Sequence, residues 1–552
     1  MRRALALIAA ALVLALAGCT GLPTTGYVNP GRGPQNDDAQ AFAFVPDGPQ
    51  DDASPAEIVE GFLRAGSGPA DDWATAKLFL APGATWDPRA RVTIDTLADR
   101  RAAASTDGSA VTVSLSTVAV VDADGAYSPA ATGSAETLSF TLARVDEQWR
   151  ITSAPNGVVL YEEVFPTVYQ SASIAYFDPT WSFIVPDVRW FPRPSVASRV
   201  ATALVDGQPS AWLAGAVRSA FPEELSLVGR SVTLSSGGVA QVQLPRAALS
   251  LDRTTLDRMQ TQLARSLASA GINEVQMTVE GTPVTASEIA VRVTRTDPSP
   301  TVLTTLGTFG TLSGDQVEAI PGLSDAVESL SPTAVEIEAD RSLAAVRTQQ
   351  GSVASALADG RTFLLDDRSG LIGPSIDGEG VIWSVPGSAP SQLRAITPEG
   401  VVRDVGNAWP DAAEITAMQI SRDGTRVAAI VTVSGTREVW VASIQRSGGD
   451  VDLGPPHVLS FSQQGAFDLG WFDDTTIGVL ATVDGSSRLR ELNVGGRGTE
   501  SPAPEGTRTL AAGGTSVRVL DDQGRLFSRR GSSWTLVGSG IRVLAAQQGT
   551  AS

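Results

Sequence analysis

Apolar residues follow a helical period at the start of the folded chain and an alternating period after it. Ser54 opens the first expected helix as part of a capping box with proline at the first helical position, and the apolar stripe runs over 58–63. A second helix is expected over 71–80. Alternation between 111 and 142 then predicts antiparallel strands. The pattern predicts an N-terminal α+β domain over residues 54–165.

Hairpin and helix patterns follow one another in the middle of the chain. Two apolar runs, 173–177 and 181–185, flank a turn and predict a hairpin. Two amphipathic helices follow, one beginning near Ser195 and one over 254–270, with strand patterns between and after them. This order of strands and helices predicts an α/β (α+β) domain over residues 166–300.

Short strand-like runs separated by turn residues fill the C-terminal half. Related segments recur about every 40–50 residues, which is the period of a propeller blade. The clearest unit spans 415–444 and contains a strand, a Ser-Arg-Asp-Gly turn, a second strand, a loop and a strand with tryptophan. Residues 315–552 are therefore expected to form an all-β propeller of about five to six blades.

The first residues of the chain have the pattern of an export signal. Two arginines precede the apolar run 4–17, and Leu16-Ala17-Gly18-Cys19 follows the lipobox pattern, in which small residues precede a cysteine. The alternative of a transmembrane anchor is disfavoured, because roughly 14 residues are fewer than the ~20 that span a bilayer. We expect residues 1–18 to be a lipoprotein signal peptide, cleaved between Gly18 and Cys19.

Cys19 is the only cysteine in the chain, so an ordinary buried thiol is the alternative to a lipidation site. Its place directly after the small residues favours modification with an S-diacylglycerol and an N-acyl group, and two or three acyl chains hold a protein stably on a bilayer. Residues 19–53 are rich in Gly, Pro, Asn, Asp and Gln and are expected to be a flexible tether. The chain is thus expected at the outer face of the cytoplasmic membrane, anchored through acylated Cys19.

Composition narrows the possible partners. The net charge is −19 and the isoelectric point is near 4.6, which argues against binding to nucleic acid or to anionic headgroups. A hydrophobic fraction of 42% in 552 residues allows several packed cores. With its one cysteine assigned to lipid, the protein is expected to hold these cores together without disulfides.

Few residues suggest catalysis, a cofactor or a metal. The segment 375–380 comes near the aspartate box of sialidases, but such boxes are structural turns. His457, the only histidine, follows two prolines and is interpreted as a loop residue and not as a general base. Three pairs of adjacent acids are expected to be solvated turn residues: Asp366-Asp367, Asp473-Asp474 and Asp521-Asp522. The sequence contains no nucleophile elbow, phosphate-binding loop or His/Cys metal spacing.

One segment carries a family resemblance. The run Ser54-Pro55-Ala56-Glu57-Ile58-Val59-Glu60-Gly61-Phe62-Leu63, followed by Ala76-Lys77-Leu78-Phe79-Leu80 and Trp86-Asp87-Pro88, resembles the amino-terminal region of LpqB, a family of actinobacterial lipoproteins. Downstream segments agree in order, and the middle domain resembles the GerMN module of spore-germination proteins. The resemblance implies a partner, the extracytoplasmic sensor region of the two-component histidine kinase MtrB, and a role in envelope homeostasis and cell division through the response regulator MtrA.

We therefore expect a non-enzymatic lipoprotein that acts by binding a membrane protein. Two alternatives stay open. One is an enzyme acting on envelope glycans, which requires two or more carboxylates meeting in the central channel of the propeller. The other is a solute-binding lipoprotein of a transporter, which requires two lobes around a ligand cleft. No contact residue for the kinase can be named from the sequence.

Overall fold

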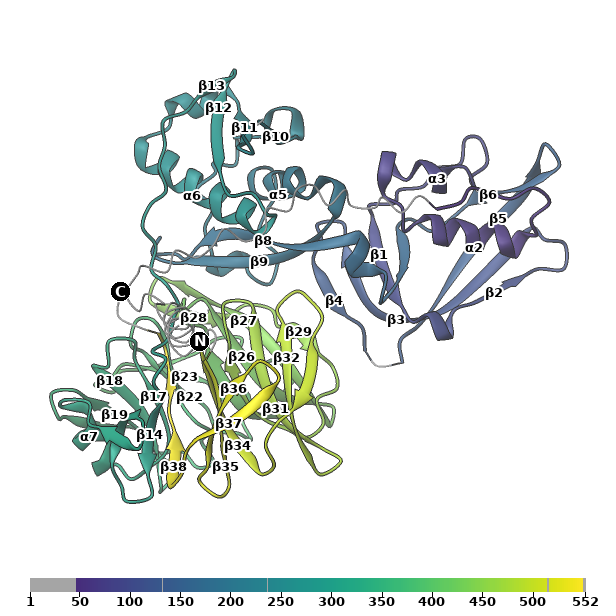
Figure 1. The fold of residues 1–552 in the computed structure, drawn as a ribbon. Helices are drawn as coiled ribbons and strands as arrows, with labels where there is room; N and C mark the ends of the chain where they lie inside the picture. Colours follow the sequence, from purple (N-terminus) through teal and green to yellow (C-terminus); the bar gives the residue numbers. More distant parts are fainter. Residues whose placement is uncertain (1–45, 132, 236, 514–515, 550–552) are drawn as a thin grey trace, which may run out of the picture. The chain divides into compact units, whose positions relative to one another are not determined.

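The computed structural model describes residues 46–131, 133–235, 237–513 and 516–549 (Figure 1). Its first helix, α2 (Pro55–Ala65), begins with the predicted capping box: the Ser54 hydroxyl accepts from the Glu57 amide, and the Glu57 carboxylate accepts from the Ser54 amide at 2.8 Å. The apolar stripe of α2 is buried against a sheet. Burial of this stripe is the main stabilising contribution to so short a helix.

The sheet that carries α2 has seven strands in the order β6-β5-β3-β1-β7, with β2 and β4 also paired to β3. β3 and β5 are antiparallel and alternate between buried and exposed residues, as expected for a sheet with one covered face. The strands are β1 (Arg91–Asp95), β2 (Arg101–Ala104), β3 (Ala110–Asp122), β4 (Tyr127–Pro129), β5 (Ala135–Val145), β6 (Gln148–Ser153) and β7 (Val158–Tyr161). Helix α4 (Phe165–Val168) ends the domain.

The prediction of one helix over 71–80 is wrong for most of that segment. Asp71, Asp72 and Trp73 have positive φ angles of 47°, 57° and 56°, so the chain forms only the 3₁₀ turn η1 (Ala70–Asp72) and the single turn α3 (Ala74–Lys77). The Trp73 side chain is buried, and its Nε1 donates to the Gly66 carbonyl at 2.9 Å. Burying this large ring outweighs the helical preference of the segment.

The middle domain begins with the predicted hairpin, β8 (Tyr169–Phe177) and β9 (Ile184–Pro192). Helix α6 (Arg253–Ser269) packs on β8, and its buried Ser266 accepts the Ala175 amide at 2.9 Å. A second sheet has the order β10-β11-β12-β13, in which β11 and β12 are parallel and are joined through α6. The remaining elements are α5 (Val196–Val205), β10 (Thr233–Leu234), β11 (Ala240–Leu244), β12 (Val275–Val279) and β13 (Thr282–Pro283).

The described residues between 301 and 547 form six sheets, which are the blades of a propeller (Figure 1). The innermost strands β38, β17, β21, β25, β30 and β34 each contact the next, which closes a ring. Apolar clusters fill the spaces between neighbouring blades, with Trp383 and Trp471 among the largest buried side chains. The six blades agree with the predicted five to six.

The strands of the blades have the following bounds. Blade one contains β38 (Ile541–Leu544), β14 (Thr301–Thr304), β15 (Phe309–Ser313) and β16 (Gln316–Glu318), and α7 (Leu323–Ser329) leads to blade two, β17 (Pro332–Ile337), β18 (Leu343–Thr348), β19 (Val353–Leu357) and β20 (Thr362–Asp366). Blade three contains β21 (Ser375–Ile376), β22 (Ile382–Ser384), β23 (Arg394–Ile396) and β24 (Val402–Asp404). Blade four contains β25 (Glu414–Ile420), β26 (Arg426–Val433), β27 (Thr436–Ser447), β28 (Asp450–Leu453) and β29 (His457–Ser460). Blade five contains β30 (Ala466–Trp471), β31 (Thr476–Val483), β32 (Ser486–Asn493) and β33 (Thr499–Pro502), and blade six contains β34 (Thr507–Gly513), β35 (Ser516–Asp521), β36 (Leu526–Arg530) and β37 (Ser533–Gly538).

The two ends of the propeller meet in blade one. β38 is its innermost strand and pairs antiparallel with β14, with Val302 opposite Leu544. The propeller therefore starts at Thr301 and not at the predicted residue 315. The sequence pattern missed this start because β14 has only four residues and its closing partner lies at the far end of the chain.

Candidate functional site

Gly18 and Cys19, the predicted cleavage and lipidation site, lie outside the described residues. Within the part of the chain that is described, no helix has both the length and the apolar character needed to cross a membrane. The same residues contain no group of three or more His, Cys, Asp or Glu side chains that could hold a metal ion.

Two of the predicted solvated acid pairs have one member in the interior, so that expectation was wrong for Asp366 and Asp521. Asp366 is buried and lies 2.6 Å from an Arg368 nitrogen, and it also accepts from the Ser384 hydroxyl. Asp521 is buried and lies 2.6 Å from Arg525 Nε. Both acids hold turns and ion pairs in place, which is a structural role.

His457 is the first residue of β29 and not a loop residue, because it pairs with Val441 of β27. Its ring stacks on the indole of Trp212 from the middle domain, with centroids 5.2 Å apart and planes 13° apart. Burial lowers the pKa of His457 to about 4, and Asp187 opposes this only in part. A neutral imidazole that stacks on an indole serves packing.

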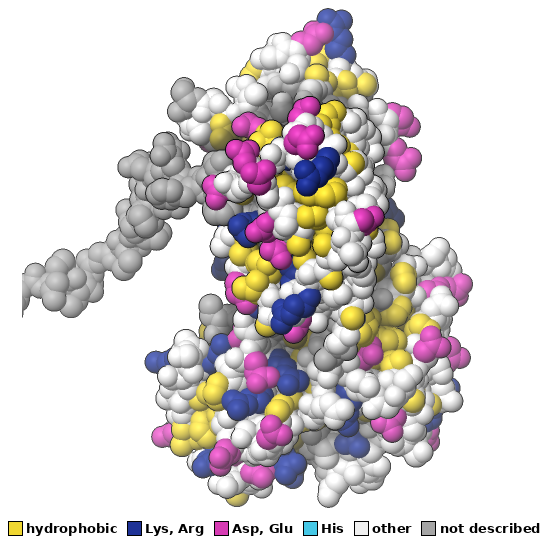
Figure 2. Space-filling view, turned by 90° about the vertical axis from the view of Figure 1, so that its right-hand side faces the viewer, with side chains coloured by type: hydrophobic (Ala, Val, Ile, Leu, Met, Phe, Trp, Pro, Cys, Tyr) yellow, Lys and Arg dark blue, Asp and Glu magenta, His cyan; other side chains and the backbone are white. Residues whose placement is uncertain are grey.

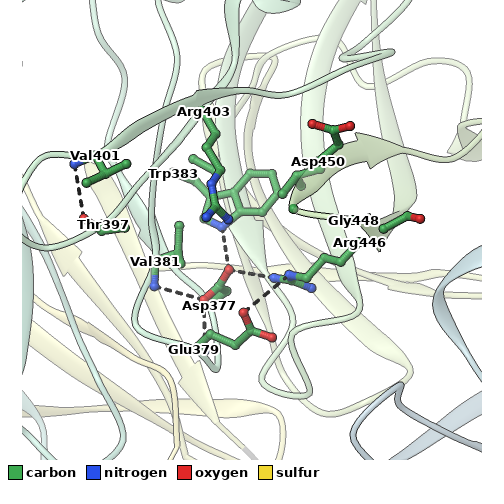
Figure 3. A pocket seen from close by; sticks show the side chains of 14 residues that line it. Asp377, Glu379, Val381, Trp383, Thr397, Val401, Arg403, Arg446, Gly448 and Asp450 are labelled. Carbon is green, nitrogen blue, oxygen red and sulfur yellow. Dashed lines mark hydrogen bonds and ion pairs between the residues drawn. The ribbon is translucent and has the colours of Figure 1, made fainter.

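The segment 375–380 forms the wall of a cleft between blades three and four (Figure 3). Asp377 is buried, and one of its oxygens accepts from Trp383 Nε1 at 2.9 Å and from Arg446 Nη2 at 2.7 Å. Its other oxygen accepts the amides of Glu379 and Val381. Asp377 thus closes the turn after β21, as the structural interpretation of this box predicts.

The cleft has a volume of about 260 Å³ and charged groups of both signs around it (Figure 3). Arg446 forms an ion pair with Asp377 and lies 3.8 Å from Glu379, whereas the guanidinium of Arg403 on β24 makes no hydrogen bond or ion pair with any described residue. Arg403, Glu379 and Asp450 are exposed. Exposed charges around a rigid cleft can orient a polar partner.

A second cavity, of about 240 Å³, lies along the innermost strands of all six blades. Two carboxyl groups line it: Glu336 of β17, which is 4% exposed, and the half-buried Asp468 of β30. Glu336 Oε1 accepts from Ser375 Oγ at 3.1 Å, from the Ile376 amide at 3.3 Å and from Gln548 Nε2. This cavity is the central channel of the propeller.

Both carboxylate oxygens of Asp468 accept hydrogen bonds from backbone amides. Its Oδ2 accepts from the Leu510 amide of β34 at 2.7 Å, and its Oδ1 accepts from the Leu469 amide at 3.0 Å. Burial raises the pKa of Asp468 and of Glu336 to about 7, and the hydrogen bonds that each accepts lower it only in part. No ion pair to either acid occurs among the described residues, so the central channel holds two carboxyl groups that titrate near neutral pH.

The C-terminal segment closes one side of the Glu336 environment. β39 (Ala546–Gln547) pairs in parallel with β17, and Gln548 Nε2 donates to Glu336 and to the Ile420 carbonyl of β25. Gln548 is 5% exposed. The segment therefore links the innermost strands of blades two and four inside the ring.

Sequence reasoning missed both channel acids. Each is a single acid within an apolar strand, Ala-Val-Glu-Ile for Glu336 and Ala-Phe-Asp-Leu for Asp468. An isolated acid inside a strand pattern is a usable signal, since buried acids are uncommon without a partner or a role. The convergence of the two from blades two and five required the ring geometry.

These features define a multidomain protein in which an α+β domain and a GerMN-like domain precede a six-bladed propeller. Family models match it in the same order: "Lipoprotein LpqB, N-terminal domain" over residues 48–166, "Sporulation and spore germination" over 173–285, and "Lipoprotein LpqB beta-propeller domain" over 307–543. The chain belongs to the LpqB family of lipoproteins, so the resemblance stated from the sequence is confirmed.

Relatives named lipoprotein LpqB align with nearly the whole chain. The protein of Cutibacterium acnes is 25% identical over 98% of both chains, and that of Thermobifida fusca is 27% identical over 93% of both. Among solved structures, TolB from Acinetobacter baumannii is similar with a TM-score of 0.35 and 13% identity, covering 45% of this chain and 66% of that one. A nidogen/laminin complex gives a TM-score of 0.33 with 10% identity, covering 45% of this chain and 97% of that one.

Proposed function

We propose that this chain is a lipid-anchored protein at the outer face of the cytoplasmic membrane that binds the extracytoplasmic sensor region of an MtrB-like histidine kinase. In doing so it modulates two-component signalling in envelope homeostasis and cell division. Membership of a lipoprotein family and the lipobox ending in Cys19 support the anchoring. The family resemblance supplies the identity of the kinase.

The observation that carries a binding role is the closed propeller ring. Pairing of β38 with β14 joins both ends of the domain, so the turns and outer strands of all blades are held at fixed positions. Preorganised surfaces bind with a smaller entropic cost than flexible ones. On the face shown in Figure 2, Lys and Arg side chains are interspersed with Asp, Glu and apolar ones, which suits a polar and reversible protein contact.

Anchoring would make a weak contact effective. Two proteins held on one membrane meet at a high local concentration, so an affinity that is low in solution still gives high occupancy. The cleft between blades three and four offers Arg403 as a free cation beside the exposed Glu379 and Asp450. We place the kinase contact at this cleft.

Photocrosslinking in intact cells tests the contact. A photoreactive amino acid replacing Arg403 should capture a sensor histidine kinase, and the same group at Leu306, which is 94% exposed in the β14–β15 turn, serves as the matched control. Capture of transporter subunits alone would instead favour the solute-binding alternative. Cys19→Ala should release the protein from the membrane fraction and abolish capture, whereas retention on membranes would refute the lipid anchor.

The glycan-active alternative has one observation in its favour, the two carboxyl groups in the central channel. Glu336 Oε1 and both oxygens of Asp468 are bound by donors within the ring, which suits a structural role better than proton transfer. Hydrolysis of purified envelope glycan by the intact protein, lost in Asp468→Asn, would establish this alternative. We expect no turnover.

A further inference from the structure

The central channel is lined by two largely buried side chains, each of which has a polar atom that the protein itself does not use. Glu336 accepts all three of its hydrogen bonds on Oε1, and its Oε2 has no partner among the described residues. Gln419 is 8% exposed and accepts the Trp471 amide on Oε1 at 2.8 Å, while its Nε2 has no partner there. Both residues line the cavity. Both side chains are more than nine-tenths buried, so their unpaired acceptor and donor are held in fixed positions at one cavity, where a ligand can use them.

Charge changes sign between the inside of this cavity and its mouth. Glu336 and Asp468 lie inside, while the exposed Arg508 and Arg542 line the same cavity from the second positions of β34 and β38. Arg508 lies 3.6 Å from Asp522, whereas the guanidinium of Arg542 makes no hydrogen bond or ion pair within the described residues. The lining thus presents acceptors for a cation in the interior and donors for an anion at the mouth.

We propose that the central channel of the propeller binds a small zwitterion, a free amino acid or a dipeptide. The ammonium group enters and donates to Glu336 and Asp468, and the carboxylate stays at the mouth against Arg542 and Arg508. Charge-assisted hydrogen bonds of this kind are the strong ones. A cavity of about 240 Å³ lies below the usual range for drug-sized ligands, which restricts the ligand to this size.

The site is independent of the kinase contact, because it uses residues inside the ring and not those of the cleft between blades three and four. Ligand binding at this site should also depend on pH. An ammonium ion beside the two acids favours their charged forms, so binding displaces protons from carboxyl groups whose pKa lies near 7. Affinity should therefore rise as the pH increases from 6 to 8.

Isothermal titration calorimetry on the full chain in detergent tests the proposal, with glycine and glycylglycine as probes. Both should bind in a saturable manner, with proton release at pH 7 measurable from the buffer dependence of the heat. Ethylamine, which lacks the carboxylate, should bind about tenfold more weakly, and acetate and glucose should not bind. Absence of saturable heat with either zwitterion up to about 10 mM would overturn the proposal.

Two kinds of variant locate the site. Arg542→Ala should weaken glycylglycine about tenfold and leave ethylamine unchanged, because only the carboxylate contact is lost. Arg530→Ala, which removes an exposed arginine of β36 outside the cavity, is the matched control. Glu336→Gln should remove binding of both amines and the proton release. Because Arg542 is exposed, its variant gives a result even where Glu336→Gln fails to fold, and equal affinity of glycylglycine for Arg542→Ala and the parent would refute the assignment.

Discussion

The indole ring of Trp212 and the imidazole of His457 stack with their centroids 5.2 Å apart, which joins the middle domain to blade four of the propeller. Burial of the imidazole lowers its pKa to about 4. The stacked ring is therefore neutral at pH 7, and its protonation is opposed by the fold. This makes the contact between the two domains sensitive to acid.

We expect the contact to weaken as the pH falls. The pKa of His457 in the fold lies below the ordinary value of 6.5, so the neutral form is favoured and its stabilisation is lost progressively between pH 6.5 and about 4. Because His457 is the only histidine, one imidazole signal in an NMR titration of the untagged chain reports this pKa directly. A titration midpoint near 6.5 would contradict the burial of the ring.

Two substitutions of His457 distinguish the contribution of ring stacking from the effect of protonation. His457→Phe keeps a flat ring against Trp212 and cannot be protonated, so it should remove the loss of stability between pH 6.5 and 4. His457→Ala removes the stacking and should destabilise the contact at every pH, by about 1 kcal/mol for the aromatic pair. Apparent melting temperatures measured at pH 7 and pH 5 distinguish the two variants.

Local patterns predicted the elements whose partners are close in sequence. The capping box at Ser54 and the helix 254–270 both appear in the structure within a residue or two of the expected bounds. The prediction of a helix over 71–80 was wrong because the burial of Trp73, a tertiary effect, determines the backbone conformation there. The predicted start of the propeller was wrong for a related reason, because β14 pairs with β38, a strand near the other end of the chain.

The site in the central channel was harder to predict from the sequence than these elements. Glu336 and Asp468 are 132 residues apart in the sequence, and only the ring of six blades places them on one cavity. Asp377 illustrates the opposite case, because three of the four residues that donate to its carboxylate, Glu379, Val381 and Trp383, follow within six residues. Its structural role was therefore visible in the sequence.

A buried ion pair in blade four should be essential for stability. Asp423 and Arg426 are both almost fully buried and bonded to each other, and Asp423 Oδ1 also accepts the Thr425 amide at 2.9 Å. Burial alone would raise the pKa of Asp423, but Arg426 and the hydrogen bonds hold it below its usual value. Asp423→Asn leaves the guanidinium buried without a counterion and should destabilise the protein by about 3–5 kcal/mol.

Urea unfolding followed by circular dichroism measures this loss. Asp404→Asn is the matched control, because Asp404 pairs with Arg394 at 3.1 Å with 84% of its side chain exposed. Exposed pairs contribute little, so this variant should unfold with the parent. Equal destabilisation by the two substitutions would contradict the importance of burial.

Gly495 is expected to be required for the contact between hairpin β8–β9 and blade five. Its φ is +86°, its carbonyl accepts from Trp190 Nε1 at 2.8 Å, and a Cβ here would lie 2.8 Å from the Val188 carbonyl oxygen. Gly495→Ala should therefore loosen this contact and increase hydrogen exchange in β9. Gly485→Ala, at a φ of +76° with no atom within 4 Å of the added Cβ, introduces only backbone strain of about 1–2 kcal/mol and should leave exchange in β9 unchanged.

The capping box of α2 should make a modest contribution. Ser54→Ala removes the acceptor for the Glu57 amide and should cost about 1 kcal/mol. Ser54→Asp restores a capping acceptor and should recover most of the loss. The apparent melting temperature of the N-terminal domain is the measurement, and a full loss of folding in Ser54→Ala would show that the helix depends on more than its cap.

Glu336 should give the propeller a stability that declines with rising pH. Its pKa in the fold is about 7 against an ordinary 4.5, so the protonated form is the one that the fold favours. The resulting stabilisation is fully present below pH 4.5 and is lost as the pH rises towards 7, a change of about 3 kcal/mol at 1.36 kcal/mol per pKa unit. Glu336→Gln keeps an amide in place of the protonated acid and should remove the part of the decline that Glu336 causes, while the part caused by Asp468, whose pKa is also raised to about 7, remains.

Gln548→Ala tests the role of the Glu336 carboxyl group by removing one of its hydrogen-bond donors. Gln548 donates to Glu336 and to the Ile420 carbonyl, so its loss removes a donor that lowers the pKa of Glu336 and leaves the buried carboxyl with fewer hydrogen bonds. We expect a destabilisation of about 1–3 kcal/mol that is larger at pH 8 than at pH 5, because the charged carboxylate depends most on its donors. Gln547→Ala, which removes a neighbouring side chain whose amide donates only to the Gly549 carbonyl, is the matched control. A pH-independent loss in Gln548→Ala would show that Gln548 acts through β17–β39 pairing and not through Glu336.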